Sequence, residues 1–450
     1  MLSSYQIVLF GAGKSAGVLI EYLKNTSSKN KWNVLVADFD LSVVQQKVGD
    51  HSYVKAAQIN IQDTHARQAL VQSATIVISM LPHAMHYLVA QDCVLFSKHL
   101  LTASYIDEKI REMENQIQEN GLIFLCEMGL DPGIDHMSAM KILDAIKKEQ
   151  GEITSFKSHC GGLVAPESDD NPWHYKISWN PRNIVLAGKA GAIYIENGQE
   201  KSCSYQEVFS GNSHVKINAE MDLAYYPNRD SLSYISLYQL HEAQTFVRTT
   251  LRYPEFINGW KYIVALRFTD EQLMHDTTKM TIAGFFRIHL EQFGFSNPDF
   301  PFTKKDFETG NDNPETQSLF VKQMEFLGLH DQQNIGKGYC SAADIFQFIL
   351  ENKLKLNSED KDMIVMLHEI EYNIHDKSKK IHSCLVVKGE NSIHTAMAKT
   401  VGLPLGIAAT LILENKLNLT GLHIPILPEI YNPVLERLEE EGIQFHETIS

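Results

Sequence analysis

The chain has 450 residues, more than one ordinary hydrophobic core accommodates, so two or three domains are expected. Apolar residues make up 44% and charged residues 21%, proportions typical of a globular protein. The net charge of −15 argues against a nucleic-acid-binding protein and against binding to an anionic membrane, since both need basic surface.

The cysteines and the N-terminus bear on the cellular compartment. Six cysteines are scattered without a CxxC pair or zinc spacing, which predicts reduced, mostly buried thiols and no metal site. The N-terminus passes directly into a predicted strand, without a charged segment and a long apolar run, so we expect no export signal and a cytoplasmic protein. We also expect no apolar run of membrane-spanning length.

The first predicted strand, Tyr5–Phe10, leads into a turn with spaced glycines and then into a helix. Gly11 permits a tight turn, Gly13 lets a pyrophosphate approach the backbone, and Ala16 is the third small residue, at which helix and strand pack closely. The free N–H groups at the start of the helix favour phosphate charge. Glycine spacing alone is weak evidence, but its position between a predicted strand and a predicted helix predicts a dinucleotide site.

The second predicted strand, Asn33–Asp38, ends in an acidic residue 25 positions after Gly13. Asp38 is placed to accept hydrogen bonds from the adenosine ribose, and its charge repels a 2′-phosphate. No Arg or Lys stands at positions 38–41 to hold such a phosphate, so NAD is favoured over NADP. The alternative is that Asp38, together with Asp40, is only a turn residue at the strand end.

Strands and helices then alternate along the first part of the chain. Further strands are predicted near Val54–Gln58, Thr75–Met80, His99–Ala103 and Leu122–Cys126, with helices near Met85–Phe96 and Asp107–Glu119. This alternation predicts an α/β fold with an N-terminal Rossmann-type, doubly wound parallel sheet. Because ligands lie beyond the carboxyl ends of such strands, the loops at Leu81–Pro82, Ser104–Tyr105 and Asp131 are expected around the nicotinamide.

From about residue 152 the pattern changes to strands without regular crossover helices. Strands are predicted at Ile153–Ser158, Ile184–Leu186, Ala192–Glu196, Tyr262–Phe268, Met363–Tyr372 and Ser383–Val387. They indicate a mixed α+β substrate and dimerisation domain with a largely antiparallel sheet over residues 131–391, helical at about 271–355. Residues 1–130 form the dinucleotide-binding domain, and residues 392–450, beginning with a helix rich in small residues, are expected to return to it. A polar loop is predicted at 306–316.

Several longer motifs resemble those of the glutamate-forming saccharopine dehydrogenases, also called saccharopine reductases. These motifs are Thr102–Ile106, Met128–Met137, His159–Glu167, Asn171–Pro172, Tyr175–Trp179, Tyr226–Ser231, Thr250–Tyr253 and Ala396–Pro404. The similarity runs in order from the glycine turn to beyond residue 400.

The resemblance implies a homodimeric oxidoreductase that cleaves saccharopine with NAD and water to L-glutamate and 2-aminoadipate 6-semialdehyde in lysine degradation. The alternative is an NADP-dependent saccharopine reductase of lysine biosynthesis. A lysine 6-dehydrogenase and a carboxyspermidine-type dehydrogenase share the two-domain plan, and a non-catalytic NAD-binding sensor or assembly protein is a hypothesis of another class. A separate lysine-ketoglutarate reductase is the candidate protein partner.

The resemblance also implies site residues. Tyr105, Asp131 and Cys160 match the polar positions that line the family's substrate and nicotinamide site and are the candidate catalytic residues. Asp131 is suited to bind the substrate ammonium or take a proton, and Tyr105 to orient the amine. Cys160 has the alternative role of a small packing residue.

Saccharopine carries three carboxylates and therefore needs fixed cations, preferably Arg for its paired donors. Arg229 and Arg252 stand in family-like motifs, with Lys176 and Arg182 as further candidates. The substrate-binding set is Ser104, Tyr105, Asp131, Arg229, Thr250 and Arg252. The cofactor-binding set is Gly11, Gly13, Lys14, Ser15, Ala16, Asp38, Asn60, Ile61, Leu81 and Pro82.

Two further residues bear on the resemblance. Asn60 stands where an acidic residue near the adenine is expected in relatives, so this contact is expected to differ. His86 lies in a family-like segment after Pro82, and packing at the start of a helix is as good an interpretation as a role in the site.

Overall fold

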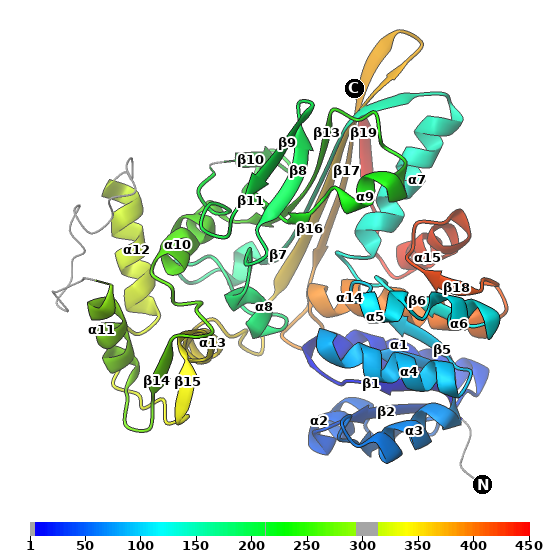
Figure 1. Ribbon diagram of the computed structural model, residues 1–450, viewed down its shortest axis with the longest axis horizontal. Coiled ribbons are helices and arrows are strands. Elements are labelled where there is room, and N and C mark those ends of the chain that lie inside the picture. The colour runs from blue at the N-terminus through cyan, green and yellow to red at the C-terminus, as the bar shows by residue number, and fades with distance from the viewer. Residues whose placement is uncertain (1–4, 212, 294–313) are drawn as a thin grey trace. The chain divides into compact units, whose positions relative to one another are not determined.

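The computed structural model describes residues 5–211, 213–293 and 314–450 and divides into two compact units (Figure 1). Unit 1 comprises residues 1–153, 237–239 and 371–450, and unit 2 comprises residues 154–236 and 240–370.

The main feature of unit 1 is a seven-stranded sheet in which every neighbouring pair is parallel. Its strands are β1 (Tyr5–Phe10), β2 (Val34–Asp38), β3 (Val54–Gln58), β4 (Ala74–Ser79), β5 (His99–Thr102), β6 (Ile123–Leu125) and β18 (Gly421–His423), in the order β18-β6-β5-β4-β1-β2-β3. The chain builds outward from β1 through β2 to β3 and then crosses to β4 on the other side of β1. This reversal creates a switch point at the carboxyl ends of β1 and β4, where doubly wound sheets bind ligands.

Helices cover this sheet, and its central strands are largely apolar because both faces are buried, whereas the edge strand β3 has exposed Lys55 and Gln58. The helices of unit 1 are η1 (Lys14–Ala16), α1 (Gly17–Asn30), α2 (Leu41–Val48), α3 (Thr64–Ser73), η2 (His83–Met85), α4 (His86–Leu95), α5 (Glu108–Arg111), α6 (Glu114–Glu119), α7 (Ile134–Lys148), α14 (Ala396–Leu413) and α15 (Pro428–Glu440). Two further strands, β17 (Lys377–Lys388) and β19 (His446–Ile449), pair antiparallel. The predicted strands that correspond to β1 through β6 are confirmed to within one residue at each end, whereas β17 begins six residues before the predicted Ser383–Val387.

Helix α14, orange in Figure 1, packs against α1 through small residues. A Cβ atom added at Gly402 would lie 3.0 Å from the Leu19 Cβ atom and 3.1 Å from its backbone N. Such close approach of two helices requires glycine at the contact. The C-terminal segment therefore supplies both a helix and the edge strand β18 to the parallel sheet.

The expectation that no run reaches membrane-spanning length is wrong for α14. This helix has 18 residues with a mean hydropathy of 1.7, which suffices by length and composition to cross a membrane. However, 78% of it is buried inside the protein, so its apolar character is explained by packing within unit 1.

Unit 2 contains a mixed sheet whose path is β10-β11-β13-β7-β16, with β8, β9 and β12 beside it. The strands are β7 (Glu152–Val164), β8 (Ala192–Glu196), β9 (Gln199–Cys203), β10 (Ser213–Lys216), β11 (Asp222–Pro227), β12 (Arg229–Asp230), β13 (Thr245–Arg252) and β16 (Asp362–Ile374). A separate pair is β14 (Met274–Asp276) and β15 (Tyr339–Ser341). Most pairs are antiparallel, as predicted, but β13 pairs with β7 and β12 with β8 in parallel.

Unit 2 has an aromatic core that contains Trp173, Phe256 and Trp260. The helices of this unit are η3 (Pro166–Ser168), α8 (Pro181–Val185), α9 (Ser233–Tyr238), α10 (Pro254–Ala265), α11 (Ile282–Gln292), α12 (Pro314–Phe326) and α13 (Ala342–Lys353). Phe256 and Trp260 of α10 stack with ring centres 4.8 Å apart.

Two strand predictions in this unit are wrong. Ile184–Leu186 overlaps α8, and most of Tyr262–Phe268 belongs to α10. Both helices begin with Pro at the first helical position, where its fixed φ favours helix initiation. The predicted helical stretches also contain the short strands β14 and β15. Of the predicted loop at 306–316, residues 306–313 lie outside the described part and 314–316 begin α12.

The contact between α1 and α14 can be tested by overfilling it. Replacing Gly402 by Val should destabilise unit 1 by about 1–3 kcal/mol, because the added carbons meet the Leu19 backbone. The measurement is the midpoint of urea unfolding, and Lys399→Val, half-buried on the same helix, controls for the helix propensity of Val. Equal midpoints for the two variants would contradict the packing argument.

Candidate functional site

The glycine turn follows β1 at the switch point and lies against the end of β4. Gly11 has φ +99°, and a Cβ atom there would lie 2.7 Å from the Met80 carbonyl oxygen, so only glycine fits. A Cβ atom at Gly13 would meet nothing within 4 Å, which leaves open space above the backbone. No side chain caps η1, which follows the turn. This open, uncapped turn fits a dinucleotide pyrophosphate.

Asp38 and Lys47 hold the turn from two sides at Ala12. Asp38 Oδ2 accepts a hydrogen bond from Ala12 N at 2.6 Å, and its Oδ1 accepts one from Asp40 N at 3.1 Å. Lys47 Nζ donates to the carbonyl oxygens of Ala12 at 2.7 Å and Gly13 at 2.5 Å. Burial lowers the pKa of Lys47, and the charge of Asp38 opposes this shift. Thus Asp38 contacts the glycine turn, its contact with the ribose stays a prediction, and Lys47 is a neighbour that the sequence analysis missed.

The loop after β3 brings Asn60 and Ile61 near the end of β2. Ile59 N donates to the Asp38 carbonyl oxygen at 2.9 Å, which fixes this loop beside the strand. The Asn60 side chain accepts from Gln62 N at 3.0 Å, and Ile61 is buried. Phe39, next to Asp38, is 70% exposed and presents an aromatic ring at the same edge of the sheet.

At the other side of the switch point, His86 joins the carboxyl ends of β4 and β5. Its Nδ1 lies 2.8 Å from Ser79 Oγ, and its Nε2 lies 2.8 Å from Ser104 Oγ. Burial, helped by the nearby charge of His83, lowers the pKa of His86 to about 4. The ring is therefore neutral near pH 7, and one of its nitrogens donates while the other accepts. His86 is suited to fix the hydroxyl direction of Ser104, not to serve as an acid. Leu81 and Pro82 precede this helix, half-buried and exposed respectively.

Tyr105 and Asp131 lie on the loops that follow β5 and β6, both half-buried. The loop with Tyr105 is held by Ile106 N, which donates to Glu127 Oε1 at 3.3 Å. Glu127 Oε2 in turn lies 2.9 Å from Nε2 of the buried His136. Asp131 precedes Pro132 through a cis peptide in the turn before α7. Buried polar groups thus hold both loops at the carboxyl edge of the sheet.

On unit 2, Cys160 and Thr250 are partners in register on the parallel strands β7 and β13. Cys160 is buried and Thr250 half-buried. A Cβ atom at Gly161 would overlap the Leu251 carbonyl oxygen, so this glycine allows the two strands to approach. The structure therefore brings together the motif His159–Glu167 and the motif Thr250–Tyr253.

Arg252 is a buried cation at the end of β13. Its guanidinium lies 5.3 Å from the ring centre of Tyr175 and 5.5 Å from that of Phe256, and Nη1 donates to the Leu251 carbonyl oxygen at 2.7 Å. Its Nε has no hydrogen-bond partner, and no carboxylate pairs with it among the described residues. A buried, unpaired guanidinium is costly unless an anion binds to it.

The other candidate cations of unit 2 differ from Arg252. Arg229 is exposed on β12 with φ +53°. Lys176 pairs with Asp170 and Asp360 at 2.8 Å each. Arg182 pairs with Glu271 and Asp344 at 2.6 and 2.9 Å. These four ion pairs satisfy Lys176 and Arg182 within the protein, which favours a structural role for both.

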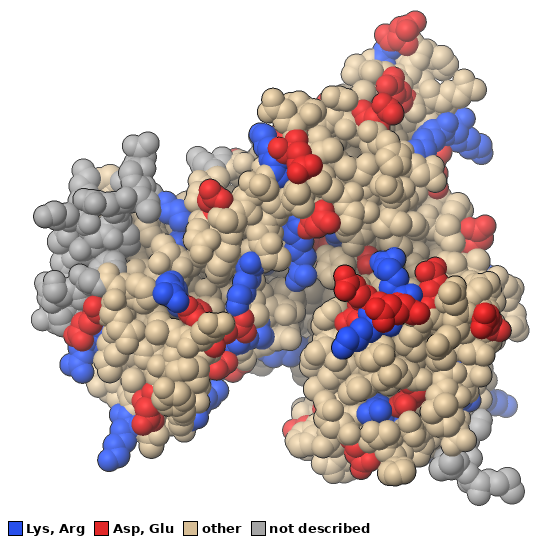
Figure 2. Space-filling view, in the orientation of Figure 1, with Lys and Arg blue, Asp and Glu red and all other residues tan. Residues whose placement is uncertain are grey.

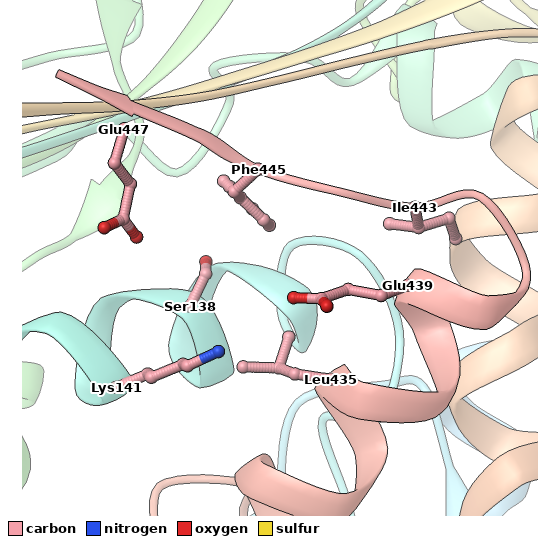
Figure 3. Close-up of a pocket in the computed structure, with 7 residues that line it drawn as sticks. All are labelled: Ser138, Lys141, Leu435, Glu439, Ile443, Phe445 and Glu447. Atoms are coloured by element: carbon pink, nitrogen blue, oxygen red, sulfur yellow. The ribbon is translucent and has the colours of Figure 1, made fainter.

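A small pocket elsewhere on unit 1 contains none of the predicted site residues. It is lined by Ser138, Lys141, Leu435, Glu439, Ile443, Phe445 and Glu447. Figure 3 shows Lys141 of α7 pointing toward Leu435 of α15, and Ser138 of α7 pointing toward Phe445. Figure 2 shows that Lys and Arg lie interspersed with Asp and Glu over the visible face. The site is therefore defined by the glycine turn and the buried polar groups, and not by this pocket.

Comparison with known proteins agrees with this geometry. The model of the saccharopine dehydrogenase NADP binding domain matches residues 7–125, and that of the saccharopine dehydrogenase C-terminal domain matches residues 129–443. The chain belongs to the saccharopine dehydrogenase family.

Saccharopine dehydrogenases appear among the relatives over the full length of this chain. The chain is 30% identical to the saccharopine dehydrogenase [NADP(+), L-glutamate-forming] of Saccharomyces cerevisiae, with 98% of each chain covered. The structure of the apo saccharopine dehydrogenase (L-Glu forming) from the same yeast superposes with a TM-score of 0.87 at 29% identity, covering 99% of this chain and all of that one.

Other relatives are longer. The chain is 32% identical to the mitochondrial alpha-aminoadipic semialdehyde synthase of Mus musculus, over 99% of this chain and 48% of that protein. The chain thus spans about half the length of the first curated relatives that it matches. Family membership establishes an oxidoreductase with a domain for a nicotinamide cofactor. The family model and the names of full-length relatives favour NADP, whereas Asp38 led us to expect NAD.

The buried state of His86 predicts a specific pH dependence of stability. A His with a folded pKa of about 4 and an unfolded value near 6.5 favours folding above pH 6.5 and loses this contribution as the pH falls toward 4. The stability advantage of the native protein over His86→Gln should therefore shrink by up to about 3 kcal/mol across that window.

Urea unfolding at pH 7 and pH 4.5 measures this difference. His289, whose pKa is likewise lowered to about 4, is present in both proteins and cancels in the comparison. A gap that stays constant with pH would show that His86 is not held neutral.

Proposed function

We propose that this chain cleaves saccharopine with NADP and water to L-glutamate and 2-aminoadipate 6-semialdehyde, or runs the reverse reaction. The observation that carries the proposal is Arg252, a buried guanidinium without a carboxylate partner among the described residues. A substrate with several carboxylates supplies the anion that this position lacks. Family membership and the NADP(+)-named relatives over the full chain length support the reaction and the cofactor.

NAD is the second candidate cofactor, and Asp38 supports it. The Asp38 carboxylate lies at the end of β2, where it is suited to accept from the ribose hydroxyls and to disfavour a 2′-phosphate. An NAD-dependent enzyme would favour lysine degradation, whereas an NADP-dependent one would favour biosynthesis. The two candidates share every proposed substrate contact and differ only at this edge of the first unit.

The bound dinucleotide would accept hydride from the carbon beside the secondary amine of saccharopine. Gly11, Gly13, Lys14, Ser15 and Ala16 would hold its pyrophosphate. Asn60, Ile61, Leu81 and Pro82 would complete the cofactor contacts in this proposal.

The other residues receive roles from their chemistry. Asp131 would bind the ammonium group or take the amine proton, and Tyr105 and Ser104 would orient the amine through their hydroxyl groups. Arg252 would hold a carboxylate, with Arg229 and Thr250 as further contacts. Cys160, buried in register with Thr250, would line the substrate site without forming a covalent bond.

The proposal extends to assembly. We propose a cytoplasmic homodimer, and a separate lysine-ketoglutarate reductase as the enzyme that supplies or consumes saccharopine. The related lysine 6-dehydrogenase and carboxyspermidine-type reactions involve fewer carboxylates and would leave Arg252 with less to bind.

The reaction can be tested directly. With saccharopine at about pH 9, where more of the amine is unprotonated, absorbance at 340 nm should rise with time in the presence of NADP. A parallel assay with NAD decides between the two cofactors by the ratio of kcat/KM. Turnover with neither cofactor, from a protein that binds NADPH or NADH, would contradict the proposed reaction.

Arg252 provides a sharper test of the substrate. Arg252→Leu should raise the KM for saccharopine on the order of a hundredfold, because a buried charge contact contributes about 2–5 kcal/mol. Cofactor affinity should stay the same. The urea midpoint should not fall, since the variant removes an uncompensated buried charge.

The matched control is Arg267→Leu, which removes an exposed arginine that pairs with Asp270 on the same unit. If Arg252→Leu left the KM unchanged and lowered the midpoint, Arg252 would be a structural residue only.

A further inference from the structure

The turn at Ala12 places a cation where the sequence between residues 38 and 41 offers none. Lys47 Nζ contacts the Ala12 carbonyl oxygen at 2.7 Å, while Asp38 Oδ2 accepts from the N–H of the same residue at 2.6 Å. The ammonium and the carboxylate therefore lie on either side of a single residue of the cofactor turn.

Lys47 is held in this position by the packing of α2. Asp40 caps the start of this helix, and its side chain accepts from Ser42 N at 2.9 Å and Val43 N at 3.3 Å. Val44 and Val48 are buried beneath it. The side chain of Lys47 is half-buried and reaches back to the turn, so its ammonium is fixed relative to Asp38.

The hydrogen-bonding capacity of both groups leaves room for a ligand. An ammonium has three donors, and Lys47 uses two of them, on Ala12 and Gly13. A carboxylate has about four acceptor sites, and two backbone N–H groups bind to Asp38. The pair therefore has both a donor and acceptors available at the place where the ribose of a dinucleotide is expected.

We infer that Lys47 determines cofactor choice by offsetting the charge of Asp38, so that this turn accepts a dinucleotide with a 2′-phosphate. The inference rests on the proposed use of NADP. It reconciles an acidic residue at the end of β2, which alone disfavours a 2′-phosphate, with the NADP named for the full-length relatives. Without Lys47, the same carboxylate would favour NAD.

The test measures the binding of NADPH and of NADH separately, in the absence of saccharopine. Cofactor fluorescence reports the binding. Lys47→Met should weaken NADPH binding at least tenfold and NADH binding at most threefold. Lys47→Arg should keep the preference of the native protein, and Lys47→Gln repeats the test if the Met variant does not fold. Because the effect is electrostatic, added salt should weaken NADPH binding more in the native protein than in Lys47→Met.

Two other lysines serve as comparisons. Lys55 is exposed on β3 of the same unit, and Lys55→Met should leave both affinities unchanged. Lys14 is exposed on the turn itself and is the rival cation. Selective loss of NADPH binding in Lys14→Met and not in Lys47→Met would overturn the inference. Equal loss of both cofactors in Lys47→Met would overturn it too, by showing that Lys47 only supports the turn.

The inference and the proposed reaction can fail separately. If Lys47→Met selectively lost NADPH while the native protein did not oxidise saccharopine, the role of Lys47 would stand and the substrate would be wrong. If saccharopine were oxidised but the native protein bound NADH far more tightly than NADPH, the reaction would stand and the role of Lys47 would be wrong.

Discussion

Residue 11 has no room for a side chain, and the arrangement of the cofactor end of unit 1 follows from that constraint. The backbone of the turn lies so close to the Met80 carbonyl that a Cβ atom would collide with it. The turn must therefore leave β1 at one fixed angle, with φ positive at Gly11. That angle places the Ala12 peptide groups between Asp38 and Lys47, so strand packing determines where the charges of the site lie.

The lack of a carboxylate partner among the described residues distinguishes Arg252 from Lys176 and Arg182 of unit 2. Lys176 and Arg182 are each paired with two carboxylates, so their charges are compensated within the protein. Arg252 is surrounded by Tyr175 and Phe256, whose ring faces offer weaker compensation than a carboxylate. Such a group lowers the stability of the free protein and increases its affinity for an anion, as expected at a binding site.

The sequence predicted the parallel sheet closely because its central strands are buried on both faces and appear as largely apolar runs. The same criterion failed at Tyr262–Phe268, where a short apolar run belongs to helix α10. Phe256, Ile257, Trp260, Ile263 and Val264 of that helix are buried at helical spacing, a pattern visible only from Pro254 onward. A short apolar run is therefore compatible with either a strand or a helix unless the residues at which a helix would begin are included.

The candidate site was predictable where a motif fixes the backbone and not where a long side chain reaches between elements. The glycine spacing identified the turn, and the position of Asp38 after its strand placed it there. Nothing in the sequence connects Lys47 to Ala12, because that contact depends on how far α2 extends and on which face it buries. To infer the cofactor from one acidic residue is to assume that any cation that offsets the charge of this residue lies nearby in the sequence. Here a cation from the end of the next helix contacts the same residue as Asp38, and by our inference a ribose substituent meets the charge of both groups.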